Sequence, residues 1–153
     1  MIITRDGDSI SAYDSNAEDV SVSGASQQHL KKLTEKDFVV DAIKRGKSLY
    51  IFDILSYDGT NISDLSVPER LKVLRGQFDS YETAHIPAPD DTVVTDEGGL
   101  EGAVERLKEE HPRLLLRDGK STYMKGERRH PKWFMLRKNK DIALIILDVR
   151  GKG

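Results

Sequence analysis

The chain has 153 residues, of which 37% are hydrophobic and 33% are charged. This length suits one domain with a core of its own, and no apolar run approaches the roughly 18 residues that a membrane-spanning helix needs. Acidic side chains near the start exclude a secretory signal peptide. The absence of cysteine excludes disulfides and fits a reducing, cytoplasmic location. The four histidines lie far apart in the sequence, so no metal site is predicted.

The first hairpin and the loop after it are indicated by turn residues. An apolar start at residues 1–4 precedes the turn at Asp6-Gly7, and polar and apolar residues alternate at 9–13. These two stretches therefore predict an antiparallel pair. Residues 14–26 are rich in Ser, Asn, Asp and Gly and predict a polar loop, and a short helix is expected at 27–33.

A second hairpin is predicted further along the chain. Residues 37–43 and 48–55 are apolar and rich in β-forming side chains, and the turn at 44–47 joins them. Another turn is expected at 57–60, where an Asp-Gly pair follows a tyrosine.

Two helices and three strands are predicted in the second half. A capping box with a proline at residues 66–69 begins the first helix, which is expected to end at Gly76. Apolar residues with helical spacing predict the second helix at about 95–111, ended by Pro112. The predicted strands are 114–116, 133–136 and 142–149, the last of them central in a sheet. Together the elements predict a single α+β domain over residues 1–153, with antiparallel sheets and a few packed helices.

The charge of the chain is unevenly distributed, although its net value is only −2. Ten basic and two acidic residues lie between Arg113 and Lys140, so that segment carries +8 and the remainder −10. A basic segment that contains aromatic residues suits phosphates and stacked bases. The predicted nucleic-acid-binding residues are Lys120, Tyr123, Lys125, Arg128, Arg129, Lys132 and Trp133. Tyr123 and Arg129 are expected in an exposed hairpin loop; the alternative is a solvated hairpin that only keeps the protein soluble.

Several segments, taken in chain order, resemble the ATP-dependent DNA ligases. Residues 50–59 (YIFDILSYDG) are similar to the family's FD-x-L…DG strand, and residues 65–74 resemble its L…P…ER…L helix. Residues 123–133 resemble its Y…G-x-R…W segment, and 145–153 its exit toward an OB-fold. The resemblance implies a shortened, ATP-grasp-like adenylation domain without the OB-fold. It also implies ATP and Mg²⁺ as cofactors and DNA or nucleotide as partner.

The resemblance implies a nucleotide site made of Phe52, Asp53, Arg117 and Arg137. Phe52 matches the aromatic residue on which the family stacks adenine; the alternative is a core phenylalanine. Asp53 is expected to assist metal or ribose binding, or else to cap the following turn. Arg117 and Arg137 stand where the family has lysines, and arginine grips phosphate bidentately.

Departures from the family pattern favour a domain that has lost the ligase reaction. In this family a lysine attacks ATP and becomes adenylated. The segment Arg5-Asp6-Gly7 aligns with the family's K-x-D-G motif, which puts Thr4 in the place of the lysine. The acidic DGE strand aligns with residues 41–43, where the glutamate is lost.

Three functions are therefore kept open. The first is a degenerate adenylation domain, inactive in catalysis, that binds nucleotide or nucleic acid through its basic segment. The second is an active ATP-dependent DNA ligase, or a fragment of one, with another lysine as nucleophile. The third is a structural or assembly protein, viral or from a mobile element, that keeps only the fold and binds a partner protein.

Overall fold

The computed structural model describes residues 1–78, 97–110, 113–117, 119–123 and 133–137. The chain divides into two compact units, each described here by itself. Unit 1 comprises Met1–Pro89 and Thr122–Gly126, and unit 2 comprises Asp90–Ser121 and Glu127–Gly153. The expectation of a single domain over 1–153 stays a prediction.

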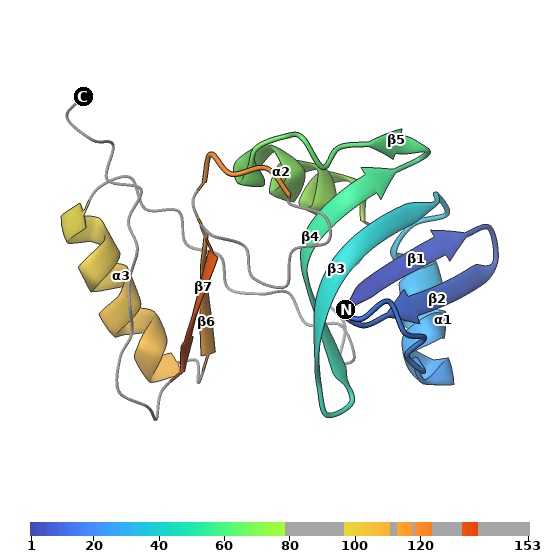
Figure 1. Cartoon of the computed structure of the whole chain (residues 1–153), viewed down its shortest axis with the longest axis horizontal. Helices are drawn as coiled ribbons and strands as arrows, with labels where there is room; N and C mark the ends of the chain where they lie inside the picture. The colour runs from blue at the N-terminus through green and yellow to red at the C-terminus, as the bar shows by residue number, and fades with distance from the viewer. Residues whose placement is uncertain (79–96, 111–112, 118, 124–132, 138–153) are drawn as a thin grey trace. The chain divides into compact units, whose positions relative to one another are not determined.

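Unit 1 is built on a five-stranded antiparallel sheet with the strand order β2-β1-β3-β4-β5, shown in Figure 1. The strands are β1 (Ile2–Asp6), β2 (Ser9–Tyr13), β3 (Phe38–Arg45), β4 (Ser48–Tyr57) and β5 (Thr60–Asn61). Both predicted hairpins are present, because β1 pairs with β2 and β3 pairs with β4. The α+β prediction is confirmed.

Tight turns fix the registers of these hairpins. Gly7 and Gly46 each stand first in a two-residue loop with φ of +57°, a backbone conformation that favours glycine. At the β4–β5 turn, Asp58 and Gly59 have φ of 49° and 78°. Two successive positive φ values are typical of a type I′ turn, for which Asp-Gly is a preferred pair.

The predicted polar loop at 14–26 is wrong at its end, because helix α1 spans Gly24–Leu33 and so begins inside it. Ser23 is the N-cap, and its side chain accepts a hydrogen bond of 3.2 Å from the backbone nitrogen of Ser26. This cap offsets the low helix propensity of glycine and serine in the first turn. The helix therefore begins three residues before its predicted start at residue 27.

The core of unit 1 is formed by residues of β1 to β4, of α1 and of the second helix. Alternate β3 side chains are buried, while those between them are only half-buried, as expected for a strand with one face in the core. Helix α2 (Val67–Gln77) starts with the predicted capping box and runs one residue past the predicted end at Gly76. The buried core residues are Ile3, Ala12, Leu30, Leu33, Phe38, Val40, Ala42, Leu49, Ile51, Ile54, Leu74 and Phe78.

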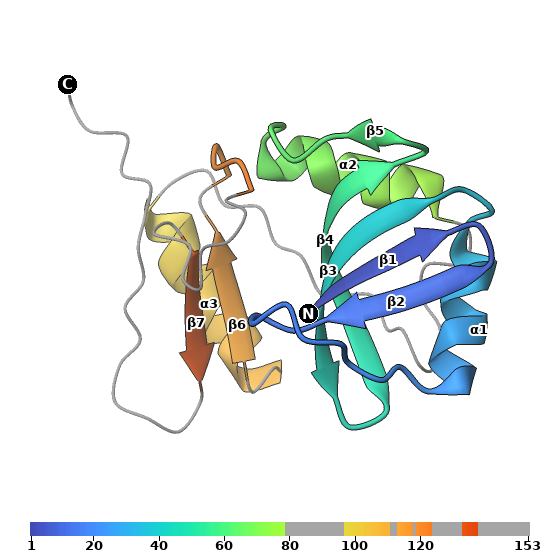
Figure 2. The same ribbon diagram turned by 45° about the vertical axis from the view of Figure 1, so that its right-hand side comes forward.

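Unit 2 contains helix α3 (Glu97–Glu110) and the antiparallel pair β6 (Arg113–Arg117) and β7 (Trp133–Arg137), seen together in Figure 2. Helix α3 matches the predicted helix at 95–111, and β6 and β7 match two of the three predicted strands. The third predicted strand, at 142–149, lies outside the described residues. Among the residues that the structure describes, no helix has the length and apolar character needed to cross a membrane.

Candidate functional site

A β-bulge in β4 sets the geometry of the candidate site. Asp41 of β3 is paired with Asp53 of β4, but the next β3 residue, Ala42, is paired with Ile51. Phe52 is therefore the extra residue of a bulge, and its side chain is half-buried. The alternative, a core phenylalanine on a central strand, also stays open, because the ring is partly buried. Bulges re-aim side chains and are common beside active sites, so the bulge agrees with a ligand-facing Phe52, which stays a prediction.

Asp53 forms a buried ion pair with Arg70 of α2. The Arg70 Nε lies 2.7 Å from Asp53 Oδ1, and its Nη2 lies 2.9 Å from Oδ2. Both side chains are completely buried, and Asp53 Oδ1 also accepts from the backbone nitrogen of Ile54. Arg70 further donates to the Leu65 carbonyl at 2.5 Å. This bidentate geometry gives Asp53 a structural role, the anchoring of α2 on β4; its part in metal or ribose binding stays a prediction.

Asp41 makes its closest side-chain contact with a residue far away in the sequence. The Tyr123 hydroxyl donates to Asp41 Oδ2 at 2.7 Å, across 82 residues of sequence. The backbone nitrogen of Tyr123 also donates to the carbonyl of Ser63 at 2.9 Å. Tyr123 is half-buried in unit 1. Tyr123 lies between the paired strands 113–117 and 133–137, as expected for a hairpin loop. The expected exposure is wrong, because its side chain is half-buried and two hydrogen bonds hold it in unit 1.

Burial dominates the electrostatics of this pair. It raises the pKa of Asp41 above its ordinary value, although the hydrogen bond from Tyr123 opposes that shift. Burial and then the negative charge of Asp41 raise the pKa of Tyr123, so its hydroxyl stays protonated and can donate. The amino group of Met1 lies 3.5 Å from Asp41 Oδ1. Asp41, Asp53 and Arg70 thus form a closely coupled group of charges together with Tyr123.

The segment aligned with the nucleophile motif has a structural function in the fold. Thr4 lies in the middle of β1, paired with Ser11 on one side and Val39 on the other. The Arg5 guanidinium donates to the carbonyls of Lys31 and Thr34 at the end of α1. Arg5 therefore satisfies carbonyl groups that a helix end leaves without partners in the helix itself.

The two arginines predicted to contact phosphate lie at opposite ends of the β6–β7 ladder. Arg117 is paired with Trp133, whereas Arg137 is paired with Arg113. Four residues of strand separate the two positions, roughly 13 Å. The register instead brings together Arg113 and Arg137, a pairing that the sequence did not reveal because the loop length between the strands leaves the register open.

The rest of the predicted nucleic-acid surface is described only in part. Lys120 is exposed, and Trp133 is the first residue of β7. Four of the predicted residues, Lys125, Arg128, Arg129 and Lys132, lie outside the described residues. Their part in nucleic-acid binding stays a prediction.

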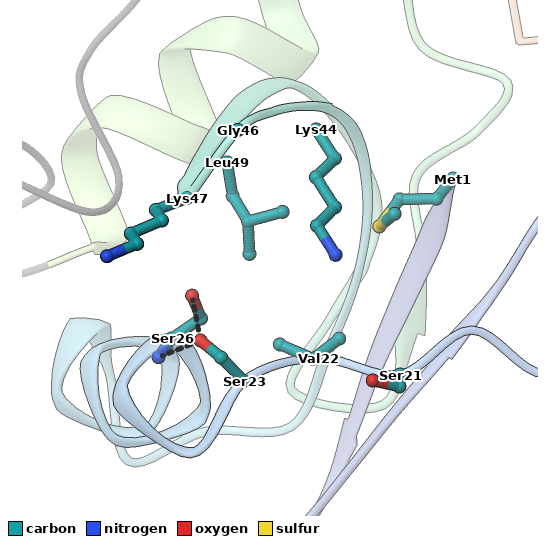
Figure 3. A pocket seen from close by; sticks show the side chains of 9 residues that line it. All are labelled: Met1, Ser21, Val22, Ser23, Ser26, Lys44, Gly46, Lys47 and Leu49. Atoms are coloured by element: carbon teal, nitrogen blue, oxygen red, sulfur yellow. Dashed lines mark hydrogen bonds between the residues drawn. The ribbon is translucent and has the colours of Figure 1, made fainter.

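A pocket of about 150 Å³ lies between the tip of the β3–β4 hairpin and the segment that begins α1. Lys44, Lys47 and Leu49 line it from the hairpin, and Val22 and three serines line it from the opposite side (Figure 3). The remaining lining residues are Met1 and Gly46. None of the lining residues is acidic. In the sequence, residues 44–47 indicate only a turn, and no local pattern places these cations beside a cavity.

Comparisons with known proteins bear on the fold. No family model matches the sequence, and no curated protein matches it. The structure is similar to the crystal structure of the ligase domain from M. tuberculosis LigD, with a TM-score of 0.61 and 14% sequence identity. The match covers 89% of this chain and 49% of that chain, so this chain spans about half the length of that structure. The likeness shows that the chain has an α+β fold like that of a ligase domain.

Proposed function

We propose that the chain is a ligase-like domain that binds nucleotide or nucleic acid and does not form a lysyl-adenylate. The ligase-domain likeness of the fold supports the first part of this proposal. The exposure of the described lysines supports the second part, that no lysyl-adenylate forms. The proposal covers this chain only, which spans about half of the ligase domain that it resembles.

The exposure of the lysines that the structure describes argues against a nucleophile among those seven. A lysine attacks a phosphate well only when burial or a neighbouring cation depresses its pKa and frees the amine. Among the lysines whose side chains the structure describes, none is buried: Lys31 is half-buried, and Lys32, Lys36, Lys44, Lys47, Lys72 and Lys120 are exposed.

The two carboxylates of the candidate site, Asp41 and Asp53, are engaged by other side chains. A Mg²⁺ ion is bound by carboxylates that are free to coordinate it. The two oxygens of Asp53 bond to Arg70, and Asp41 accepts from Tyr123. In the described part of the chain no group of three or more acidic or histidine side chains could hold a metal ion. The proposed nucleotide contact is Phe52, a half-buried aromatic residue at the bulge, because aromatic rings stack on bases.

Two measurements test the proposal. Intact mass spectrometry after incubation with ATP and Mg²⁺ should show no covalent adenylate, and an adduct on any lysine would establish an active ligase-type reaction instead. Fluorescence anisotropy with a labelled nicked DNA duplex and with a labelled ATP analogue should show binding of at least one of them. Binding of neither would favour a protein that keeps the fold as a structural or assembly unit.

A further inference from the structure

The tip of the β3–β4 hairpin carries three cations in four residues: Lys44, Arg45 and Lys47, with Gly46 between them. All three side chains are exposed. None of them forms an ion pair in the part of the chain that the structure describes. The glycine adopts φ of +57° in a two-residue loop, which keeps the turn tight and holds the cations close to one another.

The two lysines of this tip face the same pocket. Lys44 and Lys47 both line the cavity of about 150 Å³ below the hairpin. Figure 3 shows Leu49 between them and their side chains directed away from the turn. Arg45 does not line the pocket, as expected because neighbouring residues of a strand point to opposite faces. The lysine pair, and not the whole cationic tip, therefore belongs to the cavity.

In the opposite wall of the pocket, two of the three serines bond to each other. The Ser23 hydroxyl donates to Ser26 Oγ at 3.0 Å and accepts from the Ser26 nitrogen. The charged side chains of the lining are the two lysines, so they supply the main attraction for a charged ligand. Two ammonium groups beside a cavity with no carboxylate in its lining create a positive potential that favours an anion.

We propose that Lys44 and Lys47 form a phosphate-binding surface that contacts the backbone of a nucleic acid at the tip of the β3–β4 hairpin. This inference rests on the proposed function and adds a second contact surface to the basic segment at 113–140. A nucleic-acid backbone is the favoured partner because the pocket is open at an exposed hairpin tip, where a polyanion can reach it without entering the core. Ammonium groups bind phosphate as compact point charges and need no further shape matching.

The test compares the double variant K44A/K47A with wild-type protein on a labelled nicked DNA duplex over a range of salt concentrations. Loss of two phosphate contacts should weaken binding about tenfold at low salt. It should also reduce the slope of log affinity against log salt by about 1.8, since each contact contributes about 0.9. The variant K44R/K47R should keep most of the binding, because it keeps both charges.

A matched control distinguishes a local effect of Lys44 and Lys47 on DNA binding from the general effect of removing two positive charges. The variant K32A/K72A removes two exposed lysines from helices of the same unit and should change the salt slope by much less. If K44A/K47A behaves like this control, the inference is overturned. Circular dichroism and thermal unfolding should show that both double variants stay folded.

The failure of this inference and the failure of the proposed function give different results. If R128A/R129A weakens DNA binding while K44A/K47A does not, the basic segment binds DNA and only the hairpin tip is excluded. If the wild-type protein binds neither DNA nor ATP, both proposals fail together. Inorganic phosphate serves as the competitor for DNA binding. If phosphate displaces DNA from the wild type but not from K44A/K47A, the result supports a phosphate site at these lysines. Equal displacement from both proteins would overturn that site.

Discussion

The base and the tip of the β3–β4 hairpin differ in whether their charged side chains are paired and buried or exposed. Below the tip, and here called the base, Asp41 and Asp53 are paired near the middle of the β3–β4 ladder, and both are bonded to side chains from outside the hairpin. At the tip, Lys44 and Lys47 are exposed beside a cavity. Paired, buried charges hold elements together, whereas exposed charges of one sign attract a partner. The comparison predicts that substitutions at the base change stability and that those at the tip change binding.

The largest effect is expected from Arg70→Ala. This change leaves the Asp53 carboxylate buried without its ionic partner, which costs about 3–5 kcal/mol of unfolding free energy. Urea unfolding followed by circular dichroism measures it. Lys72→Ala, on an exposed position of the same helix, is the control and should stay within about 0.5 kcal/mol of wild type. A small effect of Arg70→Ala would mean that the ion pair does not anchor α2.

A smaller loss is expected from Tyr123→Phe, which keeps the ring and removes only the hydroxyl. A hydrogen bond to a charged group contributes about 1.5–3 kcal/mol, and chemical unfolding should show a loss in that range. Tyr13→Phe is a matched control, since Tyr13 is also half-buried in unit 1. Equal losses in the two variants would contradict a specific bond to Asp41.

The buried Asp41 also makes stability depend on pH. Because burial raises the pKa of Asp41, the folded protein holds this proton more tightly than the unfolded chain does. The unfolding free energy therefore falls as pH rises from about 4, the ordinary carboxyl pKa, through the raised folded value. Asp41→Asn can still accept from Tyr123 but does not titrate, so it should gain stability relative to wild type as pH rises. Parallel pH profiles of the two proteins would refute this.

The smallest effect on stability is expected at the tip. K44A/K47A removes two exposed side chains without touching Gly46, so its unfolding free energy should stay within about 0.5 kcal/mol of wild type. Urea unfolding measures this in parallel with the DNA titration. A larger loss would mean that the lysine stems pack on Leu49 and contribute to the fold, which would weaken the contrast between base and tip.

Local patterns in the sequence predicted most of the elements. The first hairpin was predicted from an Asp-Gly turn and alternating side chains, and the second from two apolar, β-rich stretches around the turn at 44–47. Helix α2 was predicted from its capping box. All of these signals act within a few residues. The start of α1 was missed because the first turn, Gly24-Ala25-Ser26, has the composition of a loop, and only the Ser23 cap marks it as helical.

The candidate site was harder to predict because its contacts are distant in sequence. Asp41 and Tyr123 are 82 residues apart, and nothing in a single sequence pairs them. The burial of Arg70 does have a signal in the sequence, because Arg70 lies at helical spacing in the same stripe as Val67, Leu71 and Leu74. A charged residue in an apolar stripe indicates a buried partner, which here is Asp53.

The hydrogen bond between Tyr123 and Asp41 joins residues that are 82 positions apart in the sequence, and this separation affects the order of folding. The strands β1 to β5 join neighbours through short turns or α1, so most of the sheet is made from contacts close in sequence, which form early. The Asp41–Tyr123 contact closes a much larger loop, and its entropy cost is met only after the sheet exists. The tyrosine should therefore dock after the rate-limiting step. Removing its hydroxyl would then speed unfolding and leave the refolding rate nearly unchanged.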